Sequence, residues 1–183
     1  MPIPAGLLAD PAELAEVLGV PVDDPTLVAR VRAASRRFLG AVRPTSFTPV
    51  DGASIWLNGD GSTTLLLPAC PVRAVTTVEV DGEALAADDF EWSEEGVLRR
   101  VCARWPDRLR SVRVVLDHGY MAVPEDVQEV VLDQAEAAFN IRKGVQSVSV
   151  DGQSVTYGTQ SAVGVTQAWA DAVTRYALRG DRA

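Results

Sequence analysis

The sequence is poor in the residues on which most catalytic and metal-binding sites depend. Its 183 residues include 1 histidine, His118, and 2 cysteines, Cys70 and Cys102. Two cysteines are too few for a disulfide framework or a structural zinc site, and they indicate a cytosolic or otherwise reducing compartment. A Ser-His-Asp or Cys-His triad would need His118, but the adjacent Asp117 is a poor partner because neighbouring side chains on a strand point to opposite faces. We therefore expect no catalytic residue, no metal site, no cofactor and no enzymatic activity.

The sequence also lacks long apolar runs and an excess of basic residues. No run approaches the roughly 20 residues of a membrane-spanning helix, and the first ten residues do not resemble a secretory signal. Lys and Arg number 17 against 25 Asp and Glu, which gives a net charge of −8. Such an acidic chain lacks the basic footprint with which proteins hold nucleic acid phosphates, although DNA can pass nearby without being bound. With 47% hydrophobic residues, the composition is that of a globular protein.

The N-terminal part, residues 1–48, carries the signals of two helices. Asp10-Pro11-Ala12-Glu13 provides an N-cap, a proline at the first helical position and an acid at the third, and Gly19 ends this short helix. Asp24-Pro25 repeats the start signal before a longer helix, which Gly40 and Pro44 end. Apolar residues of the longer helix recur at helical spacing. Its arginines lie largely off that stripe: Arg30, Arg32, Arg36 and Arg37.

Residues 49–118 are predicted to form an inserted antiparallel β domain. Short segments rich in β-branched and aromatic residues alternate there with Asp-Gly, Asn-Gly and Glu-Gly turn signals. The predicted strands are Ser54–Leu57, Thr63–Leu67, Val75–Val80, Phe90–Trp92, Val97–Val101 and Ser111–Leu116. Cys70 and Cys102 are expected to be buried, inert thiols in this sheet.

The C-terminal part, residues 119–183, returns to helical spacing. Val123-Pro124-Glu125-Asp126 begins a helix that ends before Gly144, and its first-turn acids suit the helix dipole. Val148–Tyr157 reads as two short strands around Asp-Gly, and a last helix covers about Thr166 to Leu178. The predicted fold is therefore α+β: a bundle of about four helices, with an inserted small antiparallel β domain and an extended hairpin or arm before the C-terminal helix. The last helix has one apolar stripe: Val165, Ala168, Trp169, Ala172, Val173 and Tyr176.

Two charged groups have both a functional and a structural interpretation. The only basic concentration is interleaved with Trp105, and it would suit either a nucleic acid or, as we expect, a polar strand face that balances nearby acids. It comprises Arg99, Arg100, Arg104, Arg108, Arg110 and Arg113. The paired acids lack EF-hand spacing, so solvated loops and a helix start explain them better than a cation site. They are Asp88-Asp89, Glu94-Glu95 and Glu125-Asp126.

The order of these parts resembles that of a known family. Val114–Tyr120 ends a strand in His-Gly-Tyr and runs into Pro-Glu-Asp-Val, and Pro71–Gly82 has the form Pro-Val-x-x-Val-x-x-Val followed by Asp-Gly. Val155-Thr156-Tyr157 and Arg175-Tyr176 match an extended stretch and a final helix ending in Arg-Tyr. From Asp10 to about Leu178, the chain resembles the head-to-tail adaptor (head-completion or connector) proteins of tailed bacteriophages. It departs from them where Val150-Asp151-Gly152 replaces an Ile-Gly-Asp-like turn.

The resemblance implies a structural protein of the virion neck, made in the bacterial host cytoplasm. Such adaptors form a ring, typically of twelve subunits, that binds the portal on one side and a stopper or tail component on the other. DNA passes through the lumen without specific binding, and no membrane is involved.

We hypothesise further that the segment from Val145 through Leu178 docks on the portal, because Trp, Tyr and Arg dominate many interfaces. The alternative, weighted equally, is that the last helix packs on the protein's own helices. The candidate portal-binding residues are Val155, Tyr157, Trp169, Val173, Arg175, Tyr176 and Arg179.

Three other functions stay open. A neck stopper or tail-completion protein shares the small size and acidity, but we expect such proteins to be mainly β-barrels. A small enzyme with Cys70 or Cys102 as its nucleophile would lose its activity on thiol alkylation. A nucleic-acid-binding module using the arginines between Arg99 and Arg113 would bind duplex DNA with a steep dependence on salt.

Overall fold

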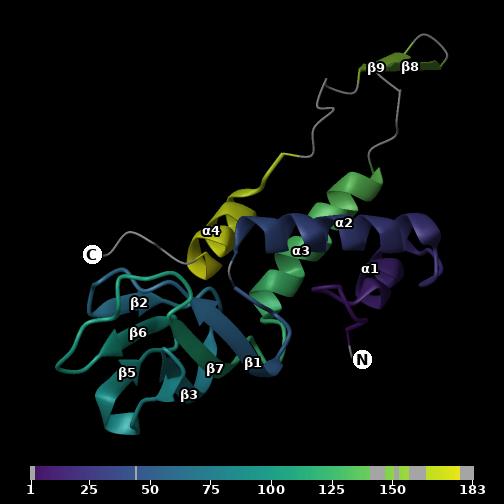
Figure 1. Ribbon diagram of the computed structural model, residues 1–183. Coiled ribbons are helices and arrows are strands. Elements are labelled where there is room, and N and C mark those ends of the chain that lie inside the picture. The colour runs from purple at the N-terminus through teal and green to yellow at the C-terminus, as the bar shows by residue number, and fades with distance from the viewer. Residues whose placement is uncertain (1–2, 44, 141–146, 151–152, 157–163, 178–183) are drawn as a thin grey trace. The chain divides into compact units, whose positions relative to one another are not determined.

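The computed structural model describes residues 3–43, 45–140, 147–150, 153–156 and 164–177 (Figure 1). Within these ranges the fold is α+β, as predicted, with four α-helices and antiparallel sheets. The chain divides into two compact units. The helical unit combines Met1–Ala41 with Pro124–Arg175, and the sheet unit combines Val42–Val123 with Tyr176–Ala183. The earlier division into residues 1–48, 49–118 and 119–183 stays a prediction.

The first two helices begin where their sequence signals place them. In α1 (Pro11–Leu18) the Asp10 carboxylate accepts a hydrogen bond from the Ala12 amide at 2.9 Å. In α2 (Pro25–Ala41) the Asp24 carboxylate accepts from the Thr26 and Leu27 amides at 2.8 and 2.9 Å. Each cap satisfies backbone donors that the helix itself leaves without partners, which is worth about 1 kcal/mol.

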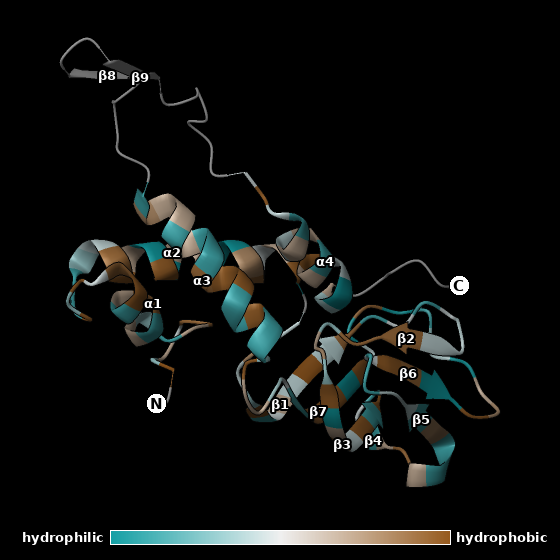
Figure 2. Cartoon of the chain, turned by 180° about the vertical axis from the view of Figure 1, so that it is seen from behind, coloured by the Kyte–Doolittle hydropathy of each residue, from teal (hydrophilic) through white to brown (hydrophobic). Residues whose placement is uncertain are grey.

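The helical unit is built on the crossing of α2 and α3 (Glu125–Asn140), and α1 packs on both (Figures 1 and 2). Each of these two helices has one buried face. The buried side chains are Leu27, Val31, Ala34, Ser35 and Phe38 of α2, and Val127, Val130, Val131, Gln134 and Ala135 of α3. Ser35 joins the N-terminal segment to this core, because its hydroxyl accepts from the Leu8 amide at 3.1 Å and donates to the Val31 carbonyl at 2.8 Å.

The sheet unit contains two antiparallel sheets. The larger has the order β1-β7-β3-β4, formed by Val50–Leu57, Val112–His118, Val72–Val80 and Glu83–Ala84. The smaller has the order β2-β6-β5, formed by Thr64–Leu66, Val97–Arg100 and Phe90–Trp92, with the 3₁₀ turn η1 (Ala87–Asp89) before β5. Outside both, β8 (Ser147–Val150) pairs with β9 (Gln153–Thr156), which is the predicted hairpin. The last helix, α4, spans Gln167–Tyr176.

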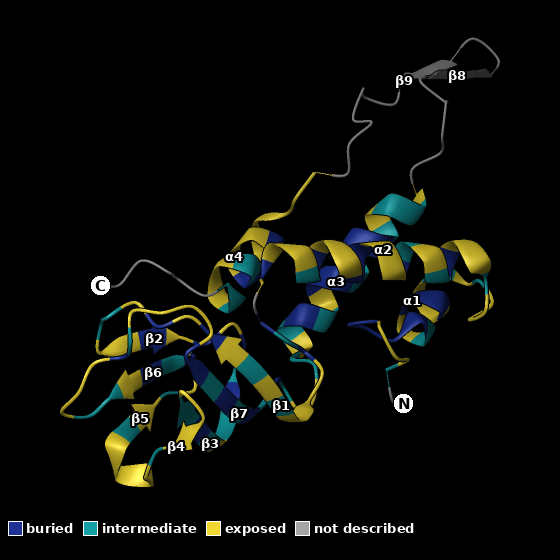
Figure 3. Cartoon of the chain, viewed as in Figure 1, coloured by how far each residue is buried: buried dark blue, intermediate teal, exposed yellow. Residues whose placement is uncertain are grey.

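One apolar core lies under both sheets and includes Leu57 of β1, Leu65 of β2 and Leu98 of β6 (Figure 3). Trp105 is 1% exposed within this core, and its indole N–H donates to the Thr63 carbonyl at 3.1 Å. This buried polar atom therefore has a partner, and the hydrogen bond compensates the cost of removing the indole N–H from water.

The expectation of two buried thiols in the sheet is wrong for Cys102. This residue is exposed, and it lies in the loop after β6 with a φ of 57°. Cys70 is half-buried between β2 and β3, where burial raises the pKa of its thiol. Both cysteines are free. Both cysteines lie in segments that connect strands, and β-propensity does not predict where a strand ends and a turn begins.

Candidate functional site

Trp169 heads the candidate portal-binding residues, and it packs inside its own helical unit. Its indole is 4% exposed and meets the Phe38 ring edge-on, with 5.1 Å between ring centroids. The Arg37 guanidinium lies over the same indole at 5.7 Å. Ala172 is also buried, whereas Ala168 and Val165 on the same stripe are exposed. The apolar stripe of α4 is thus partly used within the chain.

The other candidates are placed as follows. Val155 lies in β9 opposite Val148 of β8, and Val173 is half-buried on α4. Tyr157 and Arg179 lie outside the described residues. The portal-binding role of all seven residues stays a prediction.

Arg175 is an exposed member of the same set, and it pairs with the first turn of α3. Its guanidinium lies 2.5 Å from the Asp126 carboxylate. Both side chains retain contact with solvent, so the pair contributes between about 0 and 1 kcal/mol.

Tyr176, which ends α4, belongs to the sheet unit and completes an aromatic cluster there. Phe47 and Tyr120 stack at 5.3 Å between centroids, and Tyr176 meets each of them edge-on, at 5.5 and 5.8 Å. The Thr45 hydroxyl donates to the Tyr176 carbonyl at 2.5 Å. Sequence reasoning singled out Tyr176 but not its partners, because they lie far away in the chain.

The His-Gly-Tyr motif has a structural explanation at the end of β7. Gly119 has a φ of 89°, its amide donates to the Pro71 carbonyl at 2.8 Å, and the Tyr120 amide donates to the Ser46 carbonyl at 3.0 Å. A Cβ at Gly119 would stand 2.2 Å from the Thr48 carbonyl oxygen. Only glycine tolerates both this backbone conformation and this close approach.

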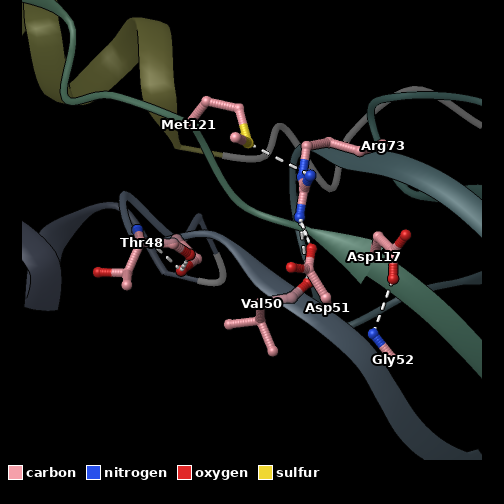
Figure 4. A network of polar contacts seen from close by, with 8 residues as sticks. Thr48, Val50, Asp51, Gly52, Arg73, Asp117 and Met121 are labelled. Carbon is pink, nitrogen blue, oxygen red and sulfur yellow. Dashed lines mark hydrogen bonds and ion pairs between the residues drawn. The ribbon is translucent and has the colours of Figure 1, made fainter.

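A polar network surrounds the start of β1 and connects it to β7 and β3 (Figure 4). Arg73 forms an ion pair with Asp51, and its guanidinium also contacts the Val50 carbonyl and the Met121 sulfur, each at 3.3 Å. Beside it, the Asp117 carboxylate accepts from the Gly52 amide at 2.7 Å. Asp117 is therefore hydrogen-bonded to the backbone of β1.

His118 lies next to this network. Burial lowers the pKa of the imidazole, the charge of Arg73 lowers it further, and Asp117 partly opposes both. Its Nδ1 atom is buried and has no hydrogen-bond partner among the described residues. The lowered pKa favours the neutral imidazole at pH 7.

The six arginines between Arg99 and Arg113 all make contacts within the sheet unit, and three of them pair with acids. Their interpretation as a polar face, rather than a nucleic-acid site, stays a prediction. Arg99 pairs with Glu91, and Arg108 pairs with Asp81. The Arg113 guanidinium donates to the Ser54 hydroxyl at 3.0 Å and lies 3.3 Å from Glu79. The others lie over tryptophan rings or donate to a carbonyl: Arg100 over Trp105, Arg110 over Trp56, and Arg104 to Gly61.

A groove of about 550 Å³ lies between α1 and α3. Its apolar part comprises Leu14, Val17 and Leu132. Its charged part is entirely acidic: Glu13, Glu125, Glu129, Asp133 and Glu136. Sequence reasoning missed this groove, since it considered Glu125 only as a helix start. The detectable signal was the recurrence of acids every three or four residues along α3.

The described part of the chain has neither a cluster of metal ligands nor a membrane-spanning helix. Within it, no three His, Cys, Asp or Glu side chains come together in a way that could hold a metal ion. The described helices also include none that is long and apolar enough to cross a membrane.

The fold of this chain is similar to that of solved structures. No family model matches the chain, and no curated protein matches it by sequence. A chain from the neck of a native GTA (gene transfer agent) particle, computed with C12 symmetry, superposes with a TM-score of 0.52 at 19% identity, covering 81% of this chain and 86% of that one. A chain from the neck of an empty GTA particle, computed with C6 symmetry, gives a TM-score of 0.52 at 20% identity, covering 83% of this chain and 88% of that one. The predicted resemblance to phage-type neck proteins is confirmed at the level of the fold.

Proposed function

We propose that this protein is a structural neck component of a phage-like particle, a head-to-tail adaptor. Twelve copies form a ring that joins the portal vertex to a stopper or tail component, and DNA passes through its lumen. The observation that carries the proposal is the fold shared with chains of two particle necks, computed with C12 and C6 symmetry, over more than four fifths of this chain. The protein acts in the virion neck after synthesis in the host cytoplasm, and it makes or breaks no covalent bonds.

The charge of the protein suits a channel for DNA. A net charge of −8 leaves no excess of cations to hold phosphates, and the six arginines from Arg99 to Arg113 already contact acids, rings or carbonyls. A neutral or acidic bore lets a polyanion slide, whereas a basic bore would bind it with strong salt dependence.

The segment from Val145 through Leu178 is the proposed portal-docking element. Val165 and Ala168 leave part of the α4 stripe open for a partner, while Trp169 anchors the helix to its own unit. To test docking without unfolding α4, residues 147–156 are replaced by a Gly-Ser linker of equal length. We expect this variant to lose recruitment to portal-bearing heads. Normal recruitment would refute the assignment of the hairpin, and a variant with V165E and A168E then tests α4 alone.

Cryo-electron microscopy of particles from cells that express the gene tests the function itself. We expect a ring of this protein between capsid and tail, and we expect deletion of the gene to leave filled heads and free tails unjoined. Particles that join normally without the protein, or a ring found elsewhere, would contradict the proposal. A matched strain carrying the gene on a plasmid serves as the control.

A further inference from the structure

The groove between α1 and α3 combines an apolar floor with unpaired negative charge. Glu129 and Asp133 are exposed one helical turn apart, and neither lies within ion-pairing distance of a basic side chain among the described residues. Val17 at its edge is 73% exposed. Like charges four residues apart destabilise a helix. Burial of an exposed valine side chain is favourable, because it removes apolar surface from water. The groove is therefore a surface that a cationic, partly apolar partner would stabilise.

The outer face of α2 has the complementary character. Arg32 and Arg36 are exposed one turn apart, and no carboxylate of the described residues pairs with either. Three small exposed residues, Ala29, Ala33 and Gly40, lie around them on this face. A Cβ at Gly40 would meet no atom within 4 Å. Small residues let another helix approach closely, while the two guanidinium groups extend far enough to meet carboxylates on it.

The two surfaces match in spacing and lie on different sides of the helical unit. Arg32 and Arg36 are separated by about 6 Å along α2, and the four-residue step from Glu129 to Asp133 on α3 covers the same rise. The outer face of α2 is opposite the face that Leu27, Val31 and Phe38 bury in the unit's core, as the exposed band along α2 in Figure 3 shows. One chain therefore cannot bring its own two surfaces together. Two copies can do so, in a heterologous contact that repeats from copy to copy and that generates a ring when the rotation between copies closes.

We propose that the occupant of the α1–α3 groove is the arginine face of α2 from the neighbouring copy. Arg32 and Arg36 meet the carboxylates of Glu129 and Asp133, and the small residues of α2 cover Val17 and Leu132. The contact relieves like-charge repulsion on both helices at once. It deepens the proposed ring adaptor and rests on that function, but it can be tested separately in solution.

Charge reversal with mixing provides the test. The groove variant E129R/D133R has two basic surfaces, and the α2 variant R32E/R36E has two acidic ones. Each alone should associate at least about tenfold more weakly than the wild type by sedimentation velocity or mass photometry. An equimolar mixture should recover association, because each variant then meets an opposite charge on both sides, and an even-numbered ring closes in strict alternation. Circular dichroism confirms that both variants are folded.

Two controls separate this contact from net charge. The variant E83R/D88R alters net charge as much as the groove variant does, but at exposed positions of the sheet unit, and it should associate like the wild type. Raising the salt from about 0.1 M to 1 M shortens the Debye length from about 10 to 3 Å, so wild-type association should weaken. Unchanged association in both reversed variants, or a mixture that fails to recover, would overturn the proposed contact.

Cross-linking identifies the partner residues directly. The sequence has one lysine, Lys143, so R36K introduces a second amine that carbodiimide can join to a carboxylate. Mixing isotopically light and heavy protein should reveal links between position 36 of one copy and Glu129 or Asp133 of another. A protein that stays monomeric at every concentration and yields no such link also overturns the contact. If the charge-reversed variants still assemble in necks, the proposed contact is wrong and the proposed function stands. If the contact forms in solution but particles lack the protein in their necks, the contact stands and the proposed function is wrong.

Discussion

Gly119 lies against the main chain of Thr48, so closely that a Cβ added to it would stand 2.2 Å from the Thr48 carbonyl oxygen. This contact joins the end of β7 to the segment that leads into β1. It gives the glycine of the His-Gly-Tyr motif a structural explanation in this chain.

Replacing Gly119 with alanine should destabilise the sheet unit by about 2–4 kcal/mol, because the added methyl group both collides with Thr48 and sits in the left-handed region. Urea unfolding followed by tryptophan fluorescence measures this change. Gly52 is the matched control, since its φ is 64° but a Cβ there meets no atom within 4 Å. G52A should cost only about 1–2 kcal/mol. Equal effects of the two substitutions would show that the contact with Thr48 is relaxed in solution.

The protonation of His118 should make stability depend on pH. Burial and Arg73 lower the pKa of this imidazole below its ordinary 6.5, so the unfolded chain binds more protons than the folded one in the window below 6.5. The contribution of His118 is therefore fully present above pH 6.5 and is lost as the pH falls toward the folded-state pKa. H118N should lose less stability than the wild type between pH 7.5 and 5.5, as measured by urea unfolding. A steeper loss in the variant would contradict the sign of the shift.

Removal of the Trp169 side chain should cost about 3–5 kcal/mol in the helical unit, because it leaves Phe38 and Arg37 facing a cavity. Thermal unfolding of W169A measures this loss. V165A changes an exposed position on the same stripe and should stay within about 0.5 kcal/mol of the wild type. If W169A is as stable as V165A, the indole is not packed as described and is free to contact a partner.

The two thiols should differ in their reaction with iodoacetamide. Cys102 is exposed, whereas burial raises the pKa of the Cys70 thiol and so reduces its reactive thiolate. Intact mass spectrometry at pH 7.5 should show one fast modification, at least about tenfold faster than the second, and C102S should remove the fast phase. A fast phase that persists in C102S would contradict this order. Assembly should survive alkylation of Cys102, unlike the activity of a thiol enzyme.

Much of the local structure followed from short-range signals. Asp24 and Pro25 mark the start of α2 because a capping carboxylate reaches amides only two and three residues further on. The β domain and the hairpin were likewise visible from turn dipeptides between β-branched runs. The order of helices and strands, and with it the resemblance to neck proteins, was therefore available before any coordinates.

Only the tertiary structure decided which distant residues meet. Arg113 faces Glu79 because these two residues are opposite each other where β3 and β7 pair. The register of this pair shifts at two irregularities in β3, and no local sequence pattern predicts such shifts. Trp169 was equally suited to a partner protein or to Phe38, since burial of an indole is favourable against either. The acidic groove likewise exists only because α1 and α3 pack side by side. Interactions within one turn or hairpin depend on residues that are neighbours in the sequence. Grooves, clusters and interfaces depend on how whole helices and strands pack.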